Sequence, residues 1–170
     1  MAKPPPPAAT DPQATRIVVG AEDFDVAAAL QFTRERVGGQ VGAIASFVGL
    51  VRDQFGDQAV DELFLEHYPG MTERSIAAII DRARARWAVL DVYVHHRVGA
   101  LLPEDQIVYV QVASAHRADA FAACEFLMDY LKTDAVLWKR ERQQSDQRWL
   151  QASDNDAQRR DAWGRGAQSD

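Results

Sequence analysis

The sequence contains very little cysteine: Cys124 is the single one among 170 residues. An internal disulfide is therefore impossible, which fits a protein kept in a reducing compartment. The sequence also lacks a run of about 20 apolar residues, the length that a membrane-spanning helix needs, and its N-terminal stretch has no apolar signal core. These absences favour a cytoplasmic location and a protein without a membrane partner.

An excess of positive charge is absent as well. The formal net charge is -6 and the isoelectric point is about 5.2, whereas non-specific nucleic-acid binders are usually basic. Aromatic and basic residues are not interleaved as they are in RNA-binding domains. We therefore expect no nucleic-acid partner. Local basic clusters in an acidic chain suit a small anionic ligand instead, because a pocket can be positive while the surface is not.

Sequence motifs for metals and nucleotides are also absent. There is no CxxC, no HExxH and no spaced set of carboxylates, the patterns typical of zinc and iron sites. His95 and His96 are adjacent in a predicted strand, so their side chains point to opposite faces and cannot chelate one metal ion together. No glycine-rich loop of the Walker or dinucleotide-binding type is present. We therefore expect neither a metal nor a cofactor.

The residues that are present are typical of one globular domain. Apolar residues make up 47% and charged residues 26% of the chain, and its length allows a substantial core. Residues 1–15 are rich in proline and alanine and are predicted to form a disordered arm, since consecutive prolines cannot join a helix or a central strand. The domain is predicted over residues 16–150, and residues 151–170 form a polar tail to which we assign no element.

Hydrophobic periodicity predicts the element order β-α-β-β-α-β-β-α-β within this domain. The strands over 40–53 and 59–68 are separated by a short turn and are expected to pair as a hairpin. The predicted fold class is therefore α+β, with three main helices and a largely antiparallel sheet, and not a doubly wound fold. The predicted strands cover residues 16–20, 40–53, 59–68, 88–99, 107–114 and 135–141, and the helices cover 23–39, 73–87 and 119–132.

Two lysines flank the predicted turn from the last helix to the last strand. Lys132 ends the helix, where the negative end of the helix dipole favours a cation. Lys139 lies in the strand, where alternation puts it on one face with Glu141 and puts Trp138 and Arg140 on the other. A lysine that is partly buried or held beside other cations can act as acid, base or nucleophile. Solvated charges on an edge strand explain the same residues without catalysis.

Other candidate residues lie at the ends of strands. His116 and Arg117 are placed where a strand ends and a helix begins, and free backbone N–H groups there attract anions. Arg52 follows another strand, from which it can bind a phosphate with two hydrogen bonds. Ordinary surface charge explains all three equally well. Cys124 shares the apolar stripe of its helix with Phe121 and is interpreted as a core residue, since free cysteine behaves as a small hydrophobe.

Four stretches of the sequence, taken together, resemble one protein family. They are VGAIASFVGLVRD, LEHYPGMTE, VHHRVGALLPEDQIVYVQVASAHRADAF and FLMDYLKTDAVLWKRE. In this order and spacing, from Arg16 to Trp149, they are similar to the large, catalytic subunit of molybdopterin synthase. EHYPGMTE together with DYLKT and WKRE carries the most specific part of this resemblance.

The resemblance implies a fold, a reaction and two kinds of protein partner. The implied fold is of the α/β-hammerhead type with an antiparallel α+β part. The implied reaction converts cyclic pyranopterin monophosphate to molybdopterin by installing the dithiolene sulfurs. The sulfur comes from a thiocarboxylate on the C-terminal glycine of a small ubiquitin-like subunit. The large subunit is expected to form a homodimer with one small subunit at each end.

The resemblance also implies roles for individual residues, which are named here by their numbers in this sequence. Lys132 and Lys139 match the family's catalytic lysines. The positions matched to substrate binding are Arg52, His116, Arg117, Arg140 and Glu141, and those matched to the channel for the partner's tail are Phe47 and Met128. Leu50 stands where some relatives carry a basic residue, so a charged contact from that position is not expected.

The alternative function is a phosphate- or pterin-binding module that has kept the fold without catalysis. The two lysines argue against this alternative, because binding alone could use arginine. The prediction carried forward is therefore a sulfurtransferase that uses Lys132 and Lys139.

Overall fold

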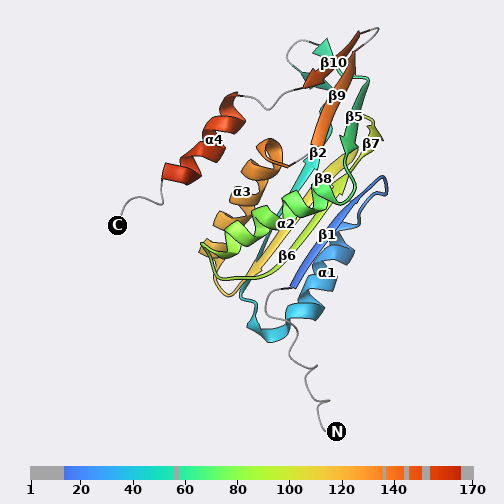
Figure 1. Cartoon of the computed structure of the whole chain (residues 1–170). Helices are drawn as coiled ribbons and strands as arrows, with labels where there is room; N and C mark the ends of the chain where they lie inside the picture. Colours follow the sequence, from blue (N-terminus) through green and yellow to red (C-terminus); the bar gives the residue numbers. More distant parts are fainter. Residues whose placement is uncertain (1–13, 56–57, 136, 144–145, 151–153, 166–170) are drawn as a thin grey trace.

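The structure, a computed structural model, describes residues 14–55, 58–135, 137–143, 146–150 and 154–165 (Figure 1). The side chains of residues 14, 55, 58, 138–143, 146–150 and 165 are outside this description. Of the arm predicted over residues 1–15, residues 1–13 lie outside the described ranges, and the last two belong to the first strand.

The elements follow one another in a mixed order of strands and helices. They are β1 (Ala14–Gly20), α1 (Val26–Val37), the 3₁₀ turn η1 (Gly38–Gln40), β2 (Ala43–Leu50), β3 (Gln54–Phe55), β4 (Gln58–Ala59), β5 (Glu62–His67), α2 (Met71–Arg84), β6 (Val89–Arg97), β7 (Gly99–Leu101), β8 (Gln106–Ser114), α3 (Arg117–Thr133), β9 (Leu137–Gln143), β10 (Asp146–Leu150) and α4 (Asp154–Arg165). The α+β class is confirmed, and the predicted helices are present as α1, α2 and α3.

The larger core lies between the first sheet and the helices α2 and α3. This sheet has the order β1-β6-β8-β2, with β1 parallel to β6 and the other pairs antiparallel. Ile76 and Ile80 of α2 and Phe126 of α3 are fully buried against Val94 and Val110 of the central strands. Isoleucines at i and i+4 lie on one helix face. This is why the sequence of α2 can cover a sheet.

The opposite face of the first sheet is covered by α1 and contains a polar network. Alternation along β6 and β8 turns Tyr93 and Tyr109 toward this face. The Tyr109 hydroxyl donates to Gln111 Oε1 at 2.5 Å, and Gln111 Nε2 donates to Thr33 Oγ1 at 2.6 Å. Because each buried polar group finds a partner, the network specifies how α1 sits on the sheet without leaving an unsatisfied group.

A buried ion pair also connects α1 to the sheet. Arg36 of α1 donates two hydrogen bonds to the carboxylate of Asp91 on β6. Burial raises the pKa of Asp91, and the bonds from Arg36 act in the opposite direction. A buried pair of this kind costs desolvation, so its contribution is to fix the position of the helix more than to add stability.

A second sheet extends from one end of the first (Figure 1) and has the order β10-β9-β5-β7, with antiparallel pairs throughout. Its core consists of Leu63 and Leu65 of β5 with Val51, Val98 and Leu101. This sheet contains β9, the strand of the WKRE motif, and therefore sets the backbone position of Lys139.

The predicted hairpin between residues 40–53 and 59–68 is wrong. β2 pairs with β8 in the first sheet, whereas β5 pairs with β7 and β9 in the second. The chain crosses between the sheets near a register shift at Gly49 and Leu50, and the short strands β3 and β4 form the hairpin at the crossing. Sequence proximity favoured the local pairing, but β2 and β5 each pair with strands that are distant in the sequence.

The polar tail contains a helix that the sequence analysis did not assign. Residues 154–165 form α4, which contacts α3. Among the described residues, no helix combines the length and the apolar character needed to cross a membrane.

His95 is a buried titratable group on the α1 side of the first sheet. Its Nε2 lies 3.2 Å from the Glu22 carbonyl oxygen and its Nδ1 lies 3.4 Å from the Tyr93 hydroxyl. The Phe24 ring packs against it with the ring centroids 5.1 Å apart. Burial lowers the pKa of His95, while the Glu22 carbonyl opposes the shift. Among the charges that face it, Arg16 and Arg97 lower this pKa and Asp23 raises it.

We expect His95 to make the fold sensitive to mild acid. Because its pKa is lower in the folded protein, the neutral ring stabilises the fold above the ordinary histidine pKa. This contribution is lost as the pH falls from that value toward the folded one, by at most about 1.4 kcal/mol per pH unit. Urea unfolding between pH 7.5 and 5.5 should show a shallower pH dependence in His95→Gln than in the wild type. The exposed control His116→Gln should follow the wild type, and equal slopes for all three proteins would contradict the prediction.

Candidate functional site

A pocket with a volume of about 510 Å³ lies between β2, α3 and α4. One strand and two helices supply its walls, so it is built on rigid elements and not on loops alone. The residues that line it are Ala45, Ser46, Phe47, Phe121, Cys124, Glu125, Met128, Asp129, Lys132, Asn155, Asp156 and Arg159.

Three of the predicted site residues meet in this pocket. Met128 and Lys132 are four residues apart in α3, so they lie on the same face of the helix, and this face is turned toward Phe47 of β2. Phe47 is 40% exposed, and Phe121, seven residues before Met128 in α3, is 68% exposed. Two partly open aromatic side chains therefore border the pocket. The apolar stripe that Phe121 shares with Cys124 is therefore buried at Cys124 and exposed at Phe121.

Lys132 lies in the last turn of α3, as the sequence predicts, and it has a partner that the sequence analysis missed. Its Nζ donates to Asp156 Oδ1 of α4 at 3.1 Å. About half of the lysine side chain remains exposed (48%), whereas the aspartate is 20% exposed. The ammonium group therefore sits at the wall of the pocket and is accessible from it.

The position of α4 depends on contacts along its length with α3 and with the turn that follows α2. Arg159 donates to Asp129 at 3.0 Å and to Glu125 at 2.5 Å. The Trp163 indole N–H donates to Asp129 at 2.8 Å, and its ring stacks edge-on against Trp87 and Phe126. A lone tryptophan in a polar tail was the one sequence signal that could have indicated a docked segment.

Cys124 also lines the pocket, but its thiol is poorly suited to chemistry. The residue is buried, which agrees with the interpretation from sequence. Burial, with a smaller contribution from Glu125, raises the pKa of the Cys124 thiol to about 11. The thiolate is the nucleophilic form of cysteine, and it is scarce at neutral pH under these conditions.

His116 and Arg117 do not reach this pocket within one chain. His116 is the N-cap of α3 and Arg117 is the first residue of that helix, and both are exposed. Lys132 is fifteen residues after Arg117, which corresponds to about 22 Å along the helix axis at about 1.5 Å per residue. The two predicted parts of the site thus lie at opposite ends of α3.

Arg52 follows the C-terminal end of β2, two residues after Leu50. β2 starts beside Ser114, close to where α3 begins, and the two elements contact each other along their length. The end of β2 therefore lies toward the C-terminal end of α3, where Lys132 is. Arg52 is exposed, and Leu50, at the last position of the strand, is 54% exposed.

The remaining predicted residues lie on β9. Lys139 pairs with Leu65 of β5 and with Leu150 of β10, and Arg140 and Glu141 follow it in the same strand. Their side chains lie outside the described residues. The structure therefore gives the backbone position of Lys139, seven residues after Lys132, and leaves the meeting of the two ammonium groups as a prediction.

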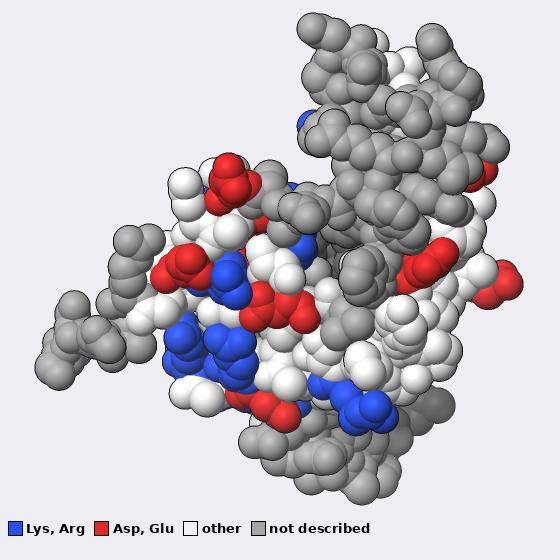
Figure 2. Space-filling view, turned by 45° about the horizontal axis from the view of Figure 1, so that its top comes forward, with Lys and Arg blue, Asp and Glu red and all other residues white. Residues whose placement is uncertain are grey.

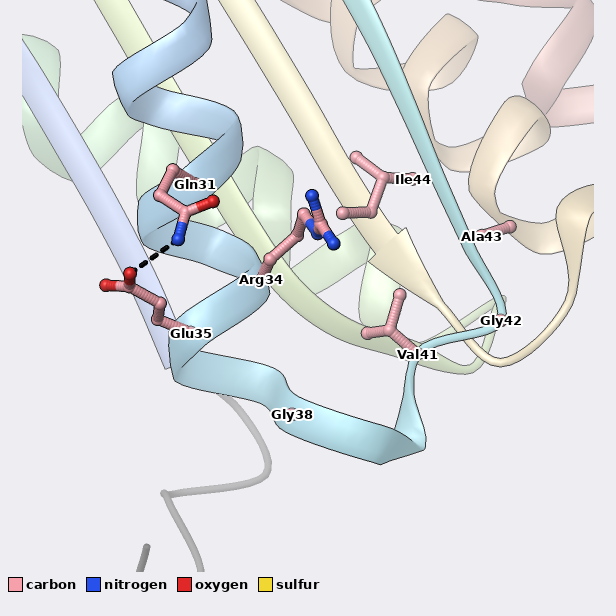
Figure 3. A pocket seen from close by; sticks show the side chains of 8 residues that line it. All are labelled: Gln31, Arg34, Glu35, Gly38, Val41, Gly42, Ala43 and Ile44. Carbon is pink, nitrogen blue, oxygen red and sulfur yellow. Dashed lines mark hydrogen bonds between the residues drawn. The ribbon is translucent and has the colours of Figure 1, made fainter.

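A second hollow, of about 580 Å³, lies between α1, η1 and the start of β2 (Figure 3). The Arg34 guanidinium points into it, and Gln31 donates to Glu35 beside it at 2.6 Å. None of the predicted site residues lines it. The other pocket is the better candidate because three of the predicted site residues, Lys132 among them, line it.

Charges of both signs are mixed on the surface around α4. Figure 2 shows basic and acidic side chains next to each other on this face, without a large area of one sign. The ion pairs of Arg159 and Arg160 with carboxylates of α3 and the following turn are of this kind. Within the described ranges, no three histidine, cysteine or carboxylate side chains are grouped so that they could hold a metal ion.

Comparisons with known proteins show the family to which this chain belongs. The model of the MoaE protein family matches residues 19–134. The molybdopterin synthase catalytic subunit of Ralstonia nicotianae is 51% identical over 142 residues, which are 84% of this chain and 80% of that protein. The resemblance found in the sequence is therefore confirmed.

Solved structures share the fold. The molybdopterin cofactor biosynthesis protein E from Burkholderia multivorans superposes with a TM-score of 0.75 at 46% identity, over 89% of this chain and 97% of that chain. A structure from Helicobacter pylori, described as a complex of subunits 1 and 2 of molybdopterin-converting factor, has a TM-score of 0.63 over 80% of this chain and 89% of that chain. At 20% identity it shows the fold alone. The chain therefore belongs to the MoaE family of molybdopterin synthase catalytic subunits.

Proposed function

We propose that this protein transfers sulfur from the C-terminal thiocarboxylate of a small ubiquitin-like subunit to cyclic pyranopterin monophosphate, and thereby forms the dithiolene of molybdopterin. The proposal rests on membership of the family and on one observation: Phe47, Met128 and Lys132 line the same open pocket. We further propose that the reaction takes place in the cytoplasm.

The pocket suits the end of a narrow polypeptide tail. Its volume of about 510 Å³ falls in the range of about 300–1,000 Å³ that is usual for ligand sites. Glycine residues at the tip of a tail let the backbone pass close to side chains such as Phe47 and Met128. The exposed rings of Phe47 and Phe121 supply apolar contacts for the body of the small subunit.

Lys132 is the residue that we assign to the thiocarboxylate. An ammonium group placed against the carbonyl oxygen stabilises the negative charge that develops there during acyl transfer. Lys139 is proposed as the second catalytic lysine, with Arg140 and Glu141 binding the substrate from the same strand. Arg52 is proposed to bind the substrate's phosphate from the end of β2.

A sulfur donor outside the chain is supported by the state of Cys124. Its buried thiol has a raised pKa, and there is no other cysteine in the sequence. The chain is therefore poorly equipped to carry sulfur itself, and the thiocarboxylate of a partner fits this deficit.

The distance along α3 supports the proposed homodimer. His116 and Arg117 cannot contact a small substrate held at Lys132 of the same chain, because most of α3 separates them. If these two residues bind the substrate as the family resemblance implies, they must do so in the pocket of a second copy. We therefore propose that each active site combines Lys132 of one protomer with His116 and Arg117 of the other.

Substitution of Lys132 tests the proposed function directly. Lys132→Ala should remain folded, since the side chain is half exposed. We expect its rate of molybdopterin formation to fall by about 100-fold or more when the thiocarboxylated partner is supplied, as happens when one charge-stabilising donor is lost. Mass spectrometry of the product measures this. Lys3→Ala is the matched control, and normal turnover by Lys132→Ala would refute the assignment.

The alternative of a non-catalytic binding module is decided by the same assay. Wild-type protein that binds the pterin precursor but forms no product with a competent thiocarboxylated partner would favour that alternative.

Mixed dimers test whether the site is shared between protomers. We expect Lys132→Ala and the double variant His116→Ala/Arg117→Ala to be inactive alone. Mixing them should restore about a quarter of the wild-type activity, because random pairing makes half of the dimers mixed and each mixed dimer has one intact site. Native mass spectrometry verifies that mixed dimers form. Mixed dimers without recovered activity would exclude a shared site.

The state of Cys124 can be measured separately. With a thiol pKa of about 11 and a buried side chain, alkylation by iodoacetamide at pH 8 should be at least about 100-fold slower in the folded protein than in urea. Intact-mass measurements over time give both rates. Comparable rates would mean that the thiol is accessible and ionised, and the case for an external sulfur donor would lose this support.

A further inference from the structure

The partner of Lys132 in this structure is a carboxylate from a distant part of the chain. Lys132 Nζ and Asp156 Oδ1 are 3.1 Å apart, and both residues line the pocket between β2, α3 and α4. No proposed catalytic role falls on α4, and the matched range of the family model ends at residue 134, before this helix begins. The contact therefore needs an explanation of its own.

The helix that carries Asp156 is fixed at several points. Arg159, one turn further along α4, binds Glu125 and Asp129 of α3. Arg160 binds Asp134 at 2.9 Å. At the other end of the helix, Arg86, in the turn that follows α2, donates to the Trp163 carbonyl oxygen at 3.0 Å. These contacts hold the part of α4 that follows Asp156, and they thereby restrict where the Asp156 carboxylate lies.

A lysine without such a partner would be poorly defined. Its ammonium group is at the end of a flexible four-carbon stem and is strongly hydrated, and Lys132 is in the last turn of its helix, with half of its side chain exposed. An ion pair to a fixed carboxylate restricts the stem to the conformations that keep the ammonium group at the pocket wall. A group that stabilises a charge developing during the reaction must be held in position beforehand, and the ion pair does this for Lys132.

We propose that Asp156 is a positioning residue for Lys132. Resting on the proposed function, the inference is that the carboxylate of α4 holds the ammonium group toward the incoming carbonyl while leaving its other N–H donors available. Asp156 does not touch the reacting atoms. Its effect reaches the reaction through the orientation of Lys132.

The kinetics of three variants at Asp156 and of one control variant provide the first test. Asp156→Asn and Asp156→Ala should lower kcat by about three- to fivefold, the size expected for a partly exposed ion pair, with the KM for the thiocarboxylated partner unchanged within about twofold. Asp156→Glu should recover most of the loss, because it restores the carboxylate. Asp161→Asn, the same change on an exposed position of α4 that pairs with Arg160, is the matched control and should leave kcat unchanged.

The sign of the change separates positioning from competition. If the Asp156 carboxylate instead competed with the partner's tail for Lys132, its removal would raise kcat or lower KM. Either increase overturns the proposal, as does an Asp156→Asn variant with wild-type kcat or an Asp161→Asn variant that loses as much.

Nuclear magnetic resonance gives a readout that does not depend on turnover. The sequence has three lysines, Lys3, Lys132 and Lys139, so protein labelled with ¹⁵N at the lysine side chains gives at most three ammonium signals, and Lys132→Arg identifies the one that belongs to Lys132. The Lys132 signal should be visible in the wild type, because the ion pair slows exchange with water, and should broaden in Asp156→Asn. The indole N–H signal of Trp163 should stay unchanged and report that α4 is still docked.

The kinetic and magnetic resonance measurements distinguish a failure of the proposed function from a failure of the positioning role of Asp156. A wild-type protein that makes no product refutes the proposed function, whereas the ammonium signal still decides whether Asp156 holds Lys132. An unchanged Lys132 signal in Asp156→Asn overturns the positioning role even when the wild type is active.

Discussion

The site depends on the way α3 is held against the first sheet. Phe126 and Leu127 bury one face of the helix against β6 and β8. Because a helix exposes its residues at fixed angles, burying that face determines which residues look toward β2, namely Met128 and Lys132. The length of α3 separates its two ends. Within one chain, Lys132 therefore does not meet His116 and Arg117. In the proposed shared site, the length of this one helix therefore connects catalysis to dimerisation.

Local sequence patterns and the family resemblance were sufficient to predict the helices α1, α2 and α3 and the position of Lys132. The isoleucines of α2 gave the helix and its buried face, and the DYLKT motif gave Lys132 at a helix end. The pairing of β2 with β8 was not predictable in this way, since strand partners are chosen by surface buried across long sequence separations. The hairpin was therefore assigned wrongly. Phe121 is exposed for a related reason, although it shares the stripe of Cys124: a residue on a helical stripe is buried only if another element covers that part of the stripe.

The helix α4 escaped prediction because its stability comes from contacts and not from its own periodicity. Arg159 and Trp163 contact carboxylates of α3 and the rings of Phe126 and Trp87. No pattern within residues 154–165 indicates these partners. Surface ion pairs are individually weak. Those of α4 are joined by the edge-on contacts of one tryptophan ring, and together they dock a segment that would have little reason to be helical alone.

The docked tail has a bearing on where this protein ends as a functional unit. Everything that identifies the chain by resemblance lies between Arg16 and Trp149. If Asp156 orients Lys132, then trimming the protein to that region would retain the recognisable motifs and remove a part of the catalytic apparatus. A purification tag that replaces the residues after 150 would also remove α4. A tag placed after residue 170 would leave α4 in the protein.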